Sequence, residues 1–217
     1  MMKRLTFALT ALALVSSLGA CSNAYYGAME ELGYEKRDIL VGRVETARDS
    51  QEEAKEQFES ALEAFRSVVD INGGELESAY DRLSAEYNRA EADAQRVRDR
   101  INSVENVSED LFREWRAELD AYQDPSLRET SARRLRETEA RYASLISQMR
   151  AAAARMDPVL EIFEDRVLFL KHNLNARAIA SLSAETGQLE ADVARLIAEM
   201  ERAIAEADAF IAANRGA

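Results

Sequence analysis

Apolar and small residues recur between residues 40 and 68 at alternating intervals of four and three, without a break. This spacing places them on one stripe of an α-helix, and its persistence over about four heptads is typical of coiled-coil-like packing. A single helix cannot bury such a stripe, so the chain must supply partner helices. The stripe consists of Leu40, Val44, Ala47, Gln51, Ala54, Phe58, Ala61, Phe65 and Val68.

Similar spacing continues through most of the remaining chain, and we predict an all-α fold. Two prolines and eight glycines in 217 residues leave few helix breaks. The expected architecture is a long antiparallel, coiled-coil-like bundle of about four up-down helices in one elongated domain, residues 21–217. These helices are expected at about residues 25–71, 75–122, 127–156 and 158–213. The turn between the first two is predicted at Gly73 and Gly74.

The other two breaks between helices are predicted from different sequence signals. Ser126 and Glu129 match a capping box at the start of the third helix. Asp157 followed by Pro158 resembles an N-cap with proline at the first helical position, which favours a turn there. The apolar spacing nevertheless runs through Pro158 without a phase shift. The alternative is therefore one proline-kinked helix, with the chain reversal near residues 183–187.

Residues 158–182 form the most apolar long stretch of the mature chain, and their apolar side chains cover more than half of a helix's circumference. Such a helix is expected to be enclosed on several sides. We therefore predict it at the centre of the bundle, wrapped by the two helices that precede it.

The N-terminus has the pattern of an export signal in residues 1–20. Lys3 and Arg4 precede an apolar run at residues 5–15, and small residues follow. Leu18-Gly19-Ala20-Cys21 resembles the bacterial lipobox, in which the cysteine is acylated and the leader is cut before it. Cys21 is the single cysteine and is the predicted lipidation site. The alternatives are a plain secretory leader with an unpaired cysteine and an uncleaved anchor.

These features predict a lipoprotein whose partner is the membrane, reached through fatty acyl chains such as palmitate on Cys21. Ser22, rather than an aspartate, follows the cysteine. By resemblance to the sorting rule of enteric bacteria, this favours the periplasmic face of the outer membrane over the inner membrane. The formal net charge of −12 argues against a nucleic-acid partner, because affinity for nucleic acid depends on neutralising phosphates.

No pattern for catalysis or for a cofactor emerges, and we expect neither. His172 is the single histidine, and a metal site needs several converging ligands. Glu161, Glu164 and Asp165 have the spacing of an exposed helical stripe as much as that of a carboxylate site, so no metal site is predicted.

A polar group follows the apolar stretch at Lys171, His172, Asn173 and Asn175. We consider two interpretations. The group is either a buried, hydrogen-bonded junction that closes the bundle, or a patch that recognises a partner.

Three segments, at residues 25–58, 111–115 and 158–182, resemble an uncharacterised bacterial lipoprotein family, domain-of-unknown-function family 2959. The stretch LKHNLNA at residues 170–176 is the most specific part of the resemblance. The resemblance implies an all-helical envelope lipoprotein of Gram-negative bacteria, with no assigned activity and no catalytic residues to transfer.

We therefore expect a lipid-anchored periplasmic scaffold or adaptor, without catalytic activity, that binds another envelope protein or itself. One alternative is a membrane-remodelling or envelope-stress coat protein. Another is an enzyme, or a carrier of an apolar ligand in the alanine-rich middle of the bundle. The oligomeric state stays open, because the apolar stripes can be covered within one chain or between chains.

Overall fold

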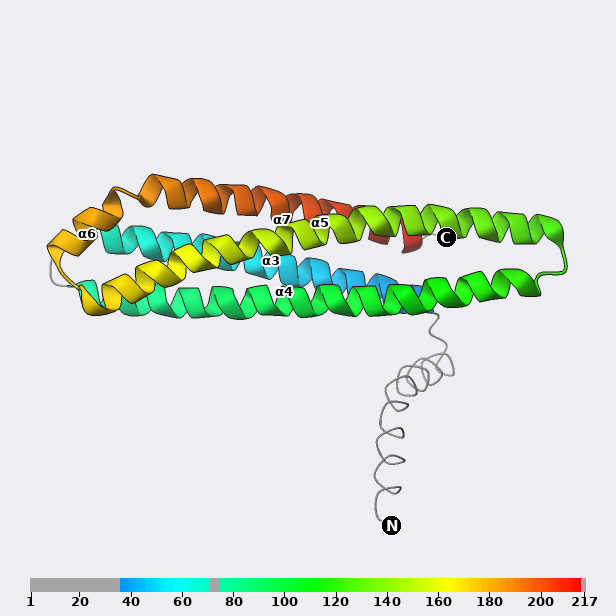
Figure 1. The fold of residues 1–217 in the computed structure, drawn as a ribbon, viewed down its shortest axis with the longest axis horizontal. Helices are drawn as coiled ribbons and strands as arrows, with labels where there is room; N and C mark the ends of the chain where they lie inside the picture. Colours follow the sequence, from blue (N-terminus) through cyan, green and yellow to red (C-terminus); the bar gives the residue numbers. More distant parts are fainter. Residues whose placement is uncertain (1–35, 71–74, 216–217) are drawn as a thin grey trace, which may run out of the picture.

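The computed structural model describes residues 36–70 and 75–215, and these are almost entirely helical (Figure 1). The predicted leader, Cys21, the first residues of the predicted first helix and the Gly73-Gly74 turn lie outside the described residues. The elements are α3 (Lys36–Val69), α4 (Leu76–Glu118), the short 3-10 helix η1 (Leu119–Ala121), α5 (Pro125–His172), α6 (Ala176–Ser183) and α7 (Thr186–Arg215).

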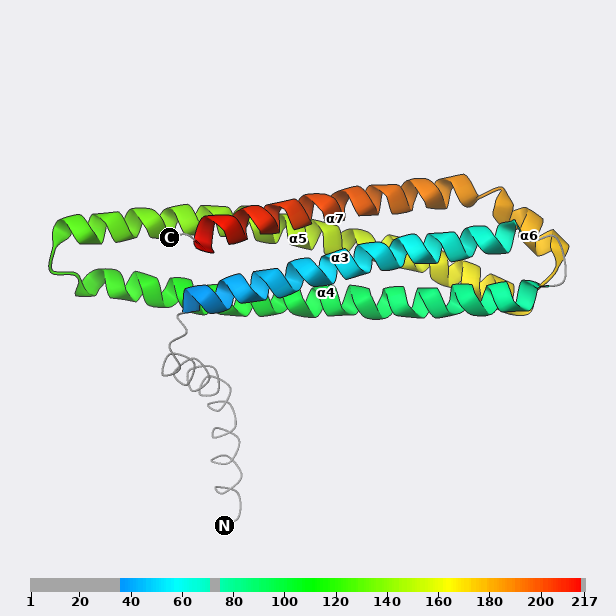
Figure 2. The same cartoon turned by 180° about the vertical axis from the view of Figure 1, so that it is seen from behind.

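The four long helices form an up-down bundle, as predicted. They alternate in direction, and each packs against two others: α3 against α4 and α7, and α5 against the same two (Figures 1 and 2). Helix α6 crosses the end of the bundle where α5 stops and α7 begins. The first residue of α3 lies toward the opposite end, where α4 connects to α5.

The core is the predicted stripe and its counterparts on the other helices. All nine stripe residues of α3 are at most 1% exposed. The matching positions of α7, from Leu189 to Phe210, are buried as well. Ala47, Ala54, Ala90 and Ala94 are covered by their neighbours, so the helices approach closely in the middle of the bundle.

Gln51 is the one polar residue of the α3 stripe. Its side chain is fully buried, and neither its amide nitrogen nor its amide oxygen has a hydrogen-bond partner among the described residues. An unsatisfied buried amide costs free energy. Gln51 therefore lowers the stability of the bundle relative to an apolar residue of similar size.

Helix α5 begins two residues earlier than predicted. Asp124, not Ser126, is its N-cap: the Asp124 carboxylate accepts hydrogen bonds from the backbone N–H groups of Ser126, at 2.8 Å, and Leu127, at 3.4 Å. Pro125 occupies the first helical position, where the absence of an N–H group costs nothing. The predicted capping box at Ser126 is thus wrong.

The turn predicted at Asp157 and Pro158 is also wrong. Helix α5 continues through Pro158, as in the alternative interpretation, and has 48 residues in all. It ends at His172, before the reversal expected near residues 183–187. Met156, Val159 and Phe163 are buried on both sides of the proline. Asp157 does not cap a helix, because it lies inside α5, and its carboxylate forms an ion pair with Arg98 on α4.

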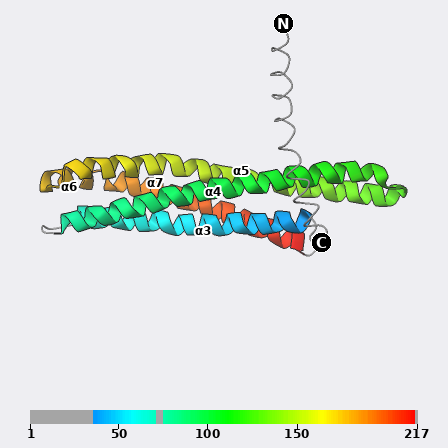
Figure 3. The same cartoon turned by 90° about the horizontal axis from the view of Figure 1, so that it is seen from below.

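The α4–α5 pair is longer than its neighbours at one end. Lys36, the first residue of α3, forms an ion pair with Glu114, whereas α4 and η1 continue to Ala121. Arg215, the last residue of α7, pairs with Glu45 on α3. The last turns of α4 and the first turns of α5 consequently extend beyond α3 and α7 as a two-helix tip (Figure 3).

Candidate interaction surfaces

The polar group predicted at residues 171–175 forms the junction between α5 and α6. The Asn173 side chain donates a hydrogen bond to the Phe169 carbonyl oxygen at 2.9 Å and follows the last residue of α5. The Asn175 side-chain oxygen accepts from the backbone N–H groups of Arg177 and Ala178, both at 3.1 Å, and caps α6. The two asparagines thus end one helix and start the next.

This junction is hydrogen-bonded, but it is not buried. Lys171, His172 and Asn175 are exposed, and Asn173 is half-buried. The interpretation as a buried junction is therefore wrong in its burial. The side chains of Lys171 and His172 remain accessible to a partner.

Large apolar side chains surround the junction on the surface. Leu168 is 50% exposed, Phe169 39% and Leu174 38%. The prediction that residues 158–182 form one helix enclosed on several sides is wrong, because the stretch is divided between α5 and α6 and these three side chains are exposed. We define the distal patch by its exposed and half-buried members: Leu168, Phe169, Lys171, His172, Asn173, Leu174 and Asn175.

The distal patch borders a shallow hollow between the end of α5 and α6. Its volume is about 530 Å³, and Phe169, Asn173, Asn175, Arg177, Ala178 and Ser181 line it. An aromatic ring, side-chain amides, a guanidinium group and a hydroxyl group thus face one small space. This mixture suits a protein segment that offers an apolar side chain and hydrogen-bond acceptors.

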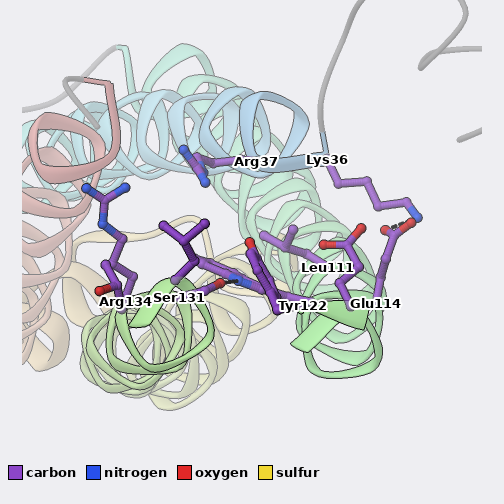
Figure 4. A pocket seen from close by; sticks show the side chains of 11 residues that line it. Lys36, Arg37, Leu111, Glu114, Tyr122, Ser131 and Arg134 are labelled. Atoms are coloured by element: carbon purple, nitrogen blue, oxygen red, sulfur yellow. Dashed lines mark hydrogen bonds and ion pairs between the residues drawn. The ribbon is translucent and has the colours of Figure 1, made fainter. Parts of the chain in front are cut away.

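A second concave surface lies at the opposite end, between the start of α3 and the two-helix tip. This tip groove has a volume of about 520 Å³ (Figure 4). The Lys36–Glu114 ion pair borders it, and the Arg37 guanidinium lies 5.6 Å from the centre of the Trp115 ring. The groove is lined by Lys36, Arg37, Leu111, Glu114, Trp115, Glu118, Tyr122, Leu127, Thr130, Ser131 and Arg134.

Apolar side chains of the tip remain uncovered by the described residues. Tyr122 is 41% exposed and Leu127 56%. Both continue the apolar spacing of their helices, yet the described residues leave them exposed. The sequence pattern missed the groove because it places Trp115, Tyr122 and Leu127 on an apolar stripe, but it does not show which residues of the other helices cover them.

The acidic residues show no arrangement for metal binding. Within residues 36–70 and 75–215, no group of three or more His, Cys, Asp or Glu side chains converges. Glu161, Glu164 and Asp165 are exposed along α5. The pKa of Asp192 on α7 is lowered by neighbouring side chains: Gln188 donates a hydrogen bond to its carboxylate, and Arg195 also stabilises the charged form.

Residues 25–213 match the model of a family described as a protein of unknown function, DUF2959. The chain belongs to this family. The match begins eleven residues before α3 and ends two residues before the end of α7, so the family domain includes residues 25–35 as well as the bundle. No curated protein and no solved structure matches the chain.

None of the described helices of this family member is both long enough and apolar enough to cross a bilayer.

Proposed function

We propose that the protein is a lipid-anchored helical scaffold or adaptor of the bacterial envelope, without catalytic activity. Its bundle would hold the distal patch away from the membrane, where another envelope protein binds it. The anchor would be acylated Cys21, at the periplasmic face of the outer membrane. The observation that carries the proposal is the position of the distal patch, at the end of the bundle opposite the first residue of α3.

The length of the bundle supports a spacer role. Helix α5 has 48 residues, which corresponds to about 70 Å at 1.5 Å per residue. Helix α3 begins toward the end of the bundle where α4 connects to α5, and the distal patch belongs to the opposite end, where α5 meets α6 (Figure 1). An anchor on Cys21, fifteen residues before Lys36, would thus leave the patch far from the bilayer surface.

The composition of the distal patch supports a role in protein binding. Five large hydrophobic side chains of the described residues are exposed, and three of them, Leu168, Phe169 and Leu174, belong to the distal patch. Clustered exposed apolar side chains mark interaction sites more often than isolated ones do. Lys171 and His172 add donors at the rim, as in the polar rims of protein interfaces.

Photo-crosslinking in the native host tests the partner. A benzophenone amino acid is placed at Leu168 or at Leu174, and the adducts are identified by mass spectrometry. The matched control carries it at Glu161, which is exposed two turns earlier on α5. We expect one reproducible envelope protein from the patch positions and none from the control. Adducts only to the protein itself or to lipid would contradict the adaptor role and favour a coat protein.

Replacement of the cysteine tests the anchor independently. We expect Cys21→Ser to move the protein from the membrane fraction to the soluble fraction, because the acyl chains supply the membrane affinity. Metabolic labelling with an alkyne analogue of palmitate should be lost in the same variant. Unchanged fractionation together with absent labelling of the wild type would refute lipidation.

A further inference from the structure

We propose that residues 25–35 of the same chain occupy the tip groove. The occupant would thus be the segment that leads from the predicted anchor into α3. This binding within the chain is independent of the proposed function. The consequence of the binding for the orientation of the bundle at the membrane rests on the proposed function.

The tip groove starts where the described chain starts. Lys36 and Arg37, the first two residues of α3, are part of its lining. Any residues that precede Lys36 are therefore tethered directly beside the groove. A short tether gives the segment an effective concentration in the millimolar range, so it outcompetes a second copy at ordinary concentrations.

The length of the segment suits the uncovered part of the tip. From Glu114, which pairs with Lys36, the chain continues for seven residues to Ala121, about 10 Å at helical rise. Residues 25–35 would span about 16 Å if they continued α3 as a helix. The segment is thus long enough to cover Trp115, Tyr122 and Leu127.

The chemistry of the segment complements the groove. Its sequence, YYGAMEELGYE, contains three tyrosines, a methionine and a leucine, which can cover the exposed side chains of Tyr122 and Leu127. It also contains three glutamates and no basic residue. The Arg134 guanidinium lines the groove and forms no salt bridge with the described residues, so it can accept one of these carboxylates.

The family match agrees with this assignment. The matched domain begins at residue 25, and not at the start of α3 or at the predicted lipobox. Residues 25–35 thus belong to the same family domain as the bundle.

The consequence concerns the orientation of the bundle. With residues 25–35 bound in the groove, Ser22, Asn23 and Ala24 alone would separate Cys21 from the tip. Three extended residues reach about 10 Å. An acylated Cys21 would then hold the tip close to the bilayer, whereas a loose segment would let the bundle tilt freely.

The main test is intramolecular crosslinking in the full chain, purified in mild detergent. A benzophenone amino acid replaces Leu127 in the groove, and equal amounts of unlabelled and ¹⁵N-labelled protein are mixed before irradiation. We expect adducts to residues 25–35 within one chain, recognised because both crosslinked peptides carry the same isotope. Leu168 is the matched control, since it lies on the same helix with similar exposure, and it should give no such adduct. Mixed-isotope adducts, or no adducts to residues 25–35, would overturn the proposal.

Trp115 provides a second readout, because it is the single tryptophan and lines the groove. The double variant Met29→Asp and Leu32→Asp should shift the Trp115 emission to longer wavelength and increase its quenching by acrylamide. Leu168→Asp, the same chemical change at the other end, should leave both unchanged. Unaltered emission and quenching in the double variant would count against the proposal. Both tests use the isolated protein, so a failure of the proposed adaptor function would not affect them.

Discussion

The indole Nε1 of Trp115 donates a hydrogen bond to the Ser131 hydroxyl oxygen at 2.8 Å. This bond joins the last turns of α4 to the first turns of α5, in the tip that α3 and α7 do not reach. The ion pairs between Arg116 and Glu139 and between Asp120 and Arg128 are exposed, so they contribute little. Trp115 and Ser131 therefore make the most specific polar contact within the tip.

We expect Ser131→Ala to lower the free energy of unfolding by about 0.5–1.5 kcal/mol, the usual contribution of one hydrogen bond. Urea denaturation followed by circular dichroism measures the change, and Trp115 emission reports the tip itself. Ser131→Thr keeps the hydroxyl group and should restore most of the stability. An equal loss in both variants would mean that packing, rather than the hydrogen bond, joins the two helices.

Gln51→Leu should stabilise the bundle. The buried amide has no hydrogen-bond partner among the described residues, and an unsatisfied buried group costs about 1–3 kcal/mol. Leucine has a similar size and no polar atoms, so we expect a gain of that order in urea denaturation. Gln57→Leu is the control and should destabilise, because Gln57 Nε2 donates to the Glu86 carboxylate at 2.7 Å. A loss of stability in Gln51→Leu would show that the buried amide does not destabilise this core.

Phe163 and Phe169 allow a matched comparison on one helix. Phe163 is fully buried, and Phe163→Ala should lower the free energy of unfolding by about 3–5 kcal/mol through the cavity it leaves. Phe169 is 39% exposed, and Phe169→Ala should cost about 1 kcal/mol or less. Thermal and urea unfolding measure both variants. If Phe169 serves partner binding, its variant should also lose the adducts formed from Leu168 while it remains folded.

Pro158→Ala should stabilise α5. Proline in a helix interior removes a backbone hydrogen bond and costs up to about 3 kcal/mol relative to alanine. Pro125→Ala is the control: Pro125 lies at the first position of the same helix, where its substitution should change stability little. Equal effects of the two substitutions in urea denaturation would show that the free-energy cost of a proline does not depend on its position in this helix.

Tyr142 should make the bundle sensitive to alkaline pH. Its burial raises the pKa of the phenol above the ordinary value of 10.0, because the charged phenolate is poorly solvated beside Phe112. The folded state therefore keeps the proton more tightly than the unfolded state does. The free energy of unfolding therefore keeps its full value below about pH 10, and it falls as the pH rises through the pKa of Tyr142 in the folded state.

Tyr142→Phe should flatten this alkaline decline, as measured by urea denaturation at a series of pH values from neutral upward. Part of the decline should remain, since burial also raises the pKa of Tyr87. An unaltered profile in Tyr142→Phe would show that Tyr142 ionises equally readily in the folded and unfolded states.

Two Asp-Pro pairs illustrate where local sequence signals fail. Asp124 caps a helix and Pro125 starts it, whereas Asp157 and Pro158 lie inside the same helix. The pairs are identical in sequence, and the difference lies in their surroundings. Buried side chains continue past Pro158 on the α5 face that packs against α4 and α7, and Asp157 pairs with Arg98. Packing across the bundle therefore outweighs the cost of an interior proline.

The spacing of apolar residues by itself determined the helical class and the core stripe of α3, since all nine stripe residues are buried. The period of such a stripe is a property of the single helix, so it can be read from the chain. Whether a given stripe residue is covered depends on where the neighbouring helices end. Only the tertiary structure decided that the described residues leave Tyr122, Leu127, Leu168 and Phe169 exposed, because the neighbouring elements do not cover these side chains.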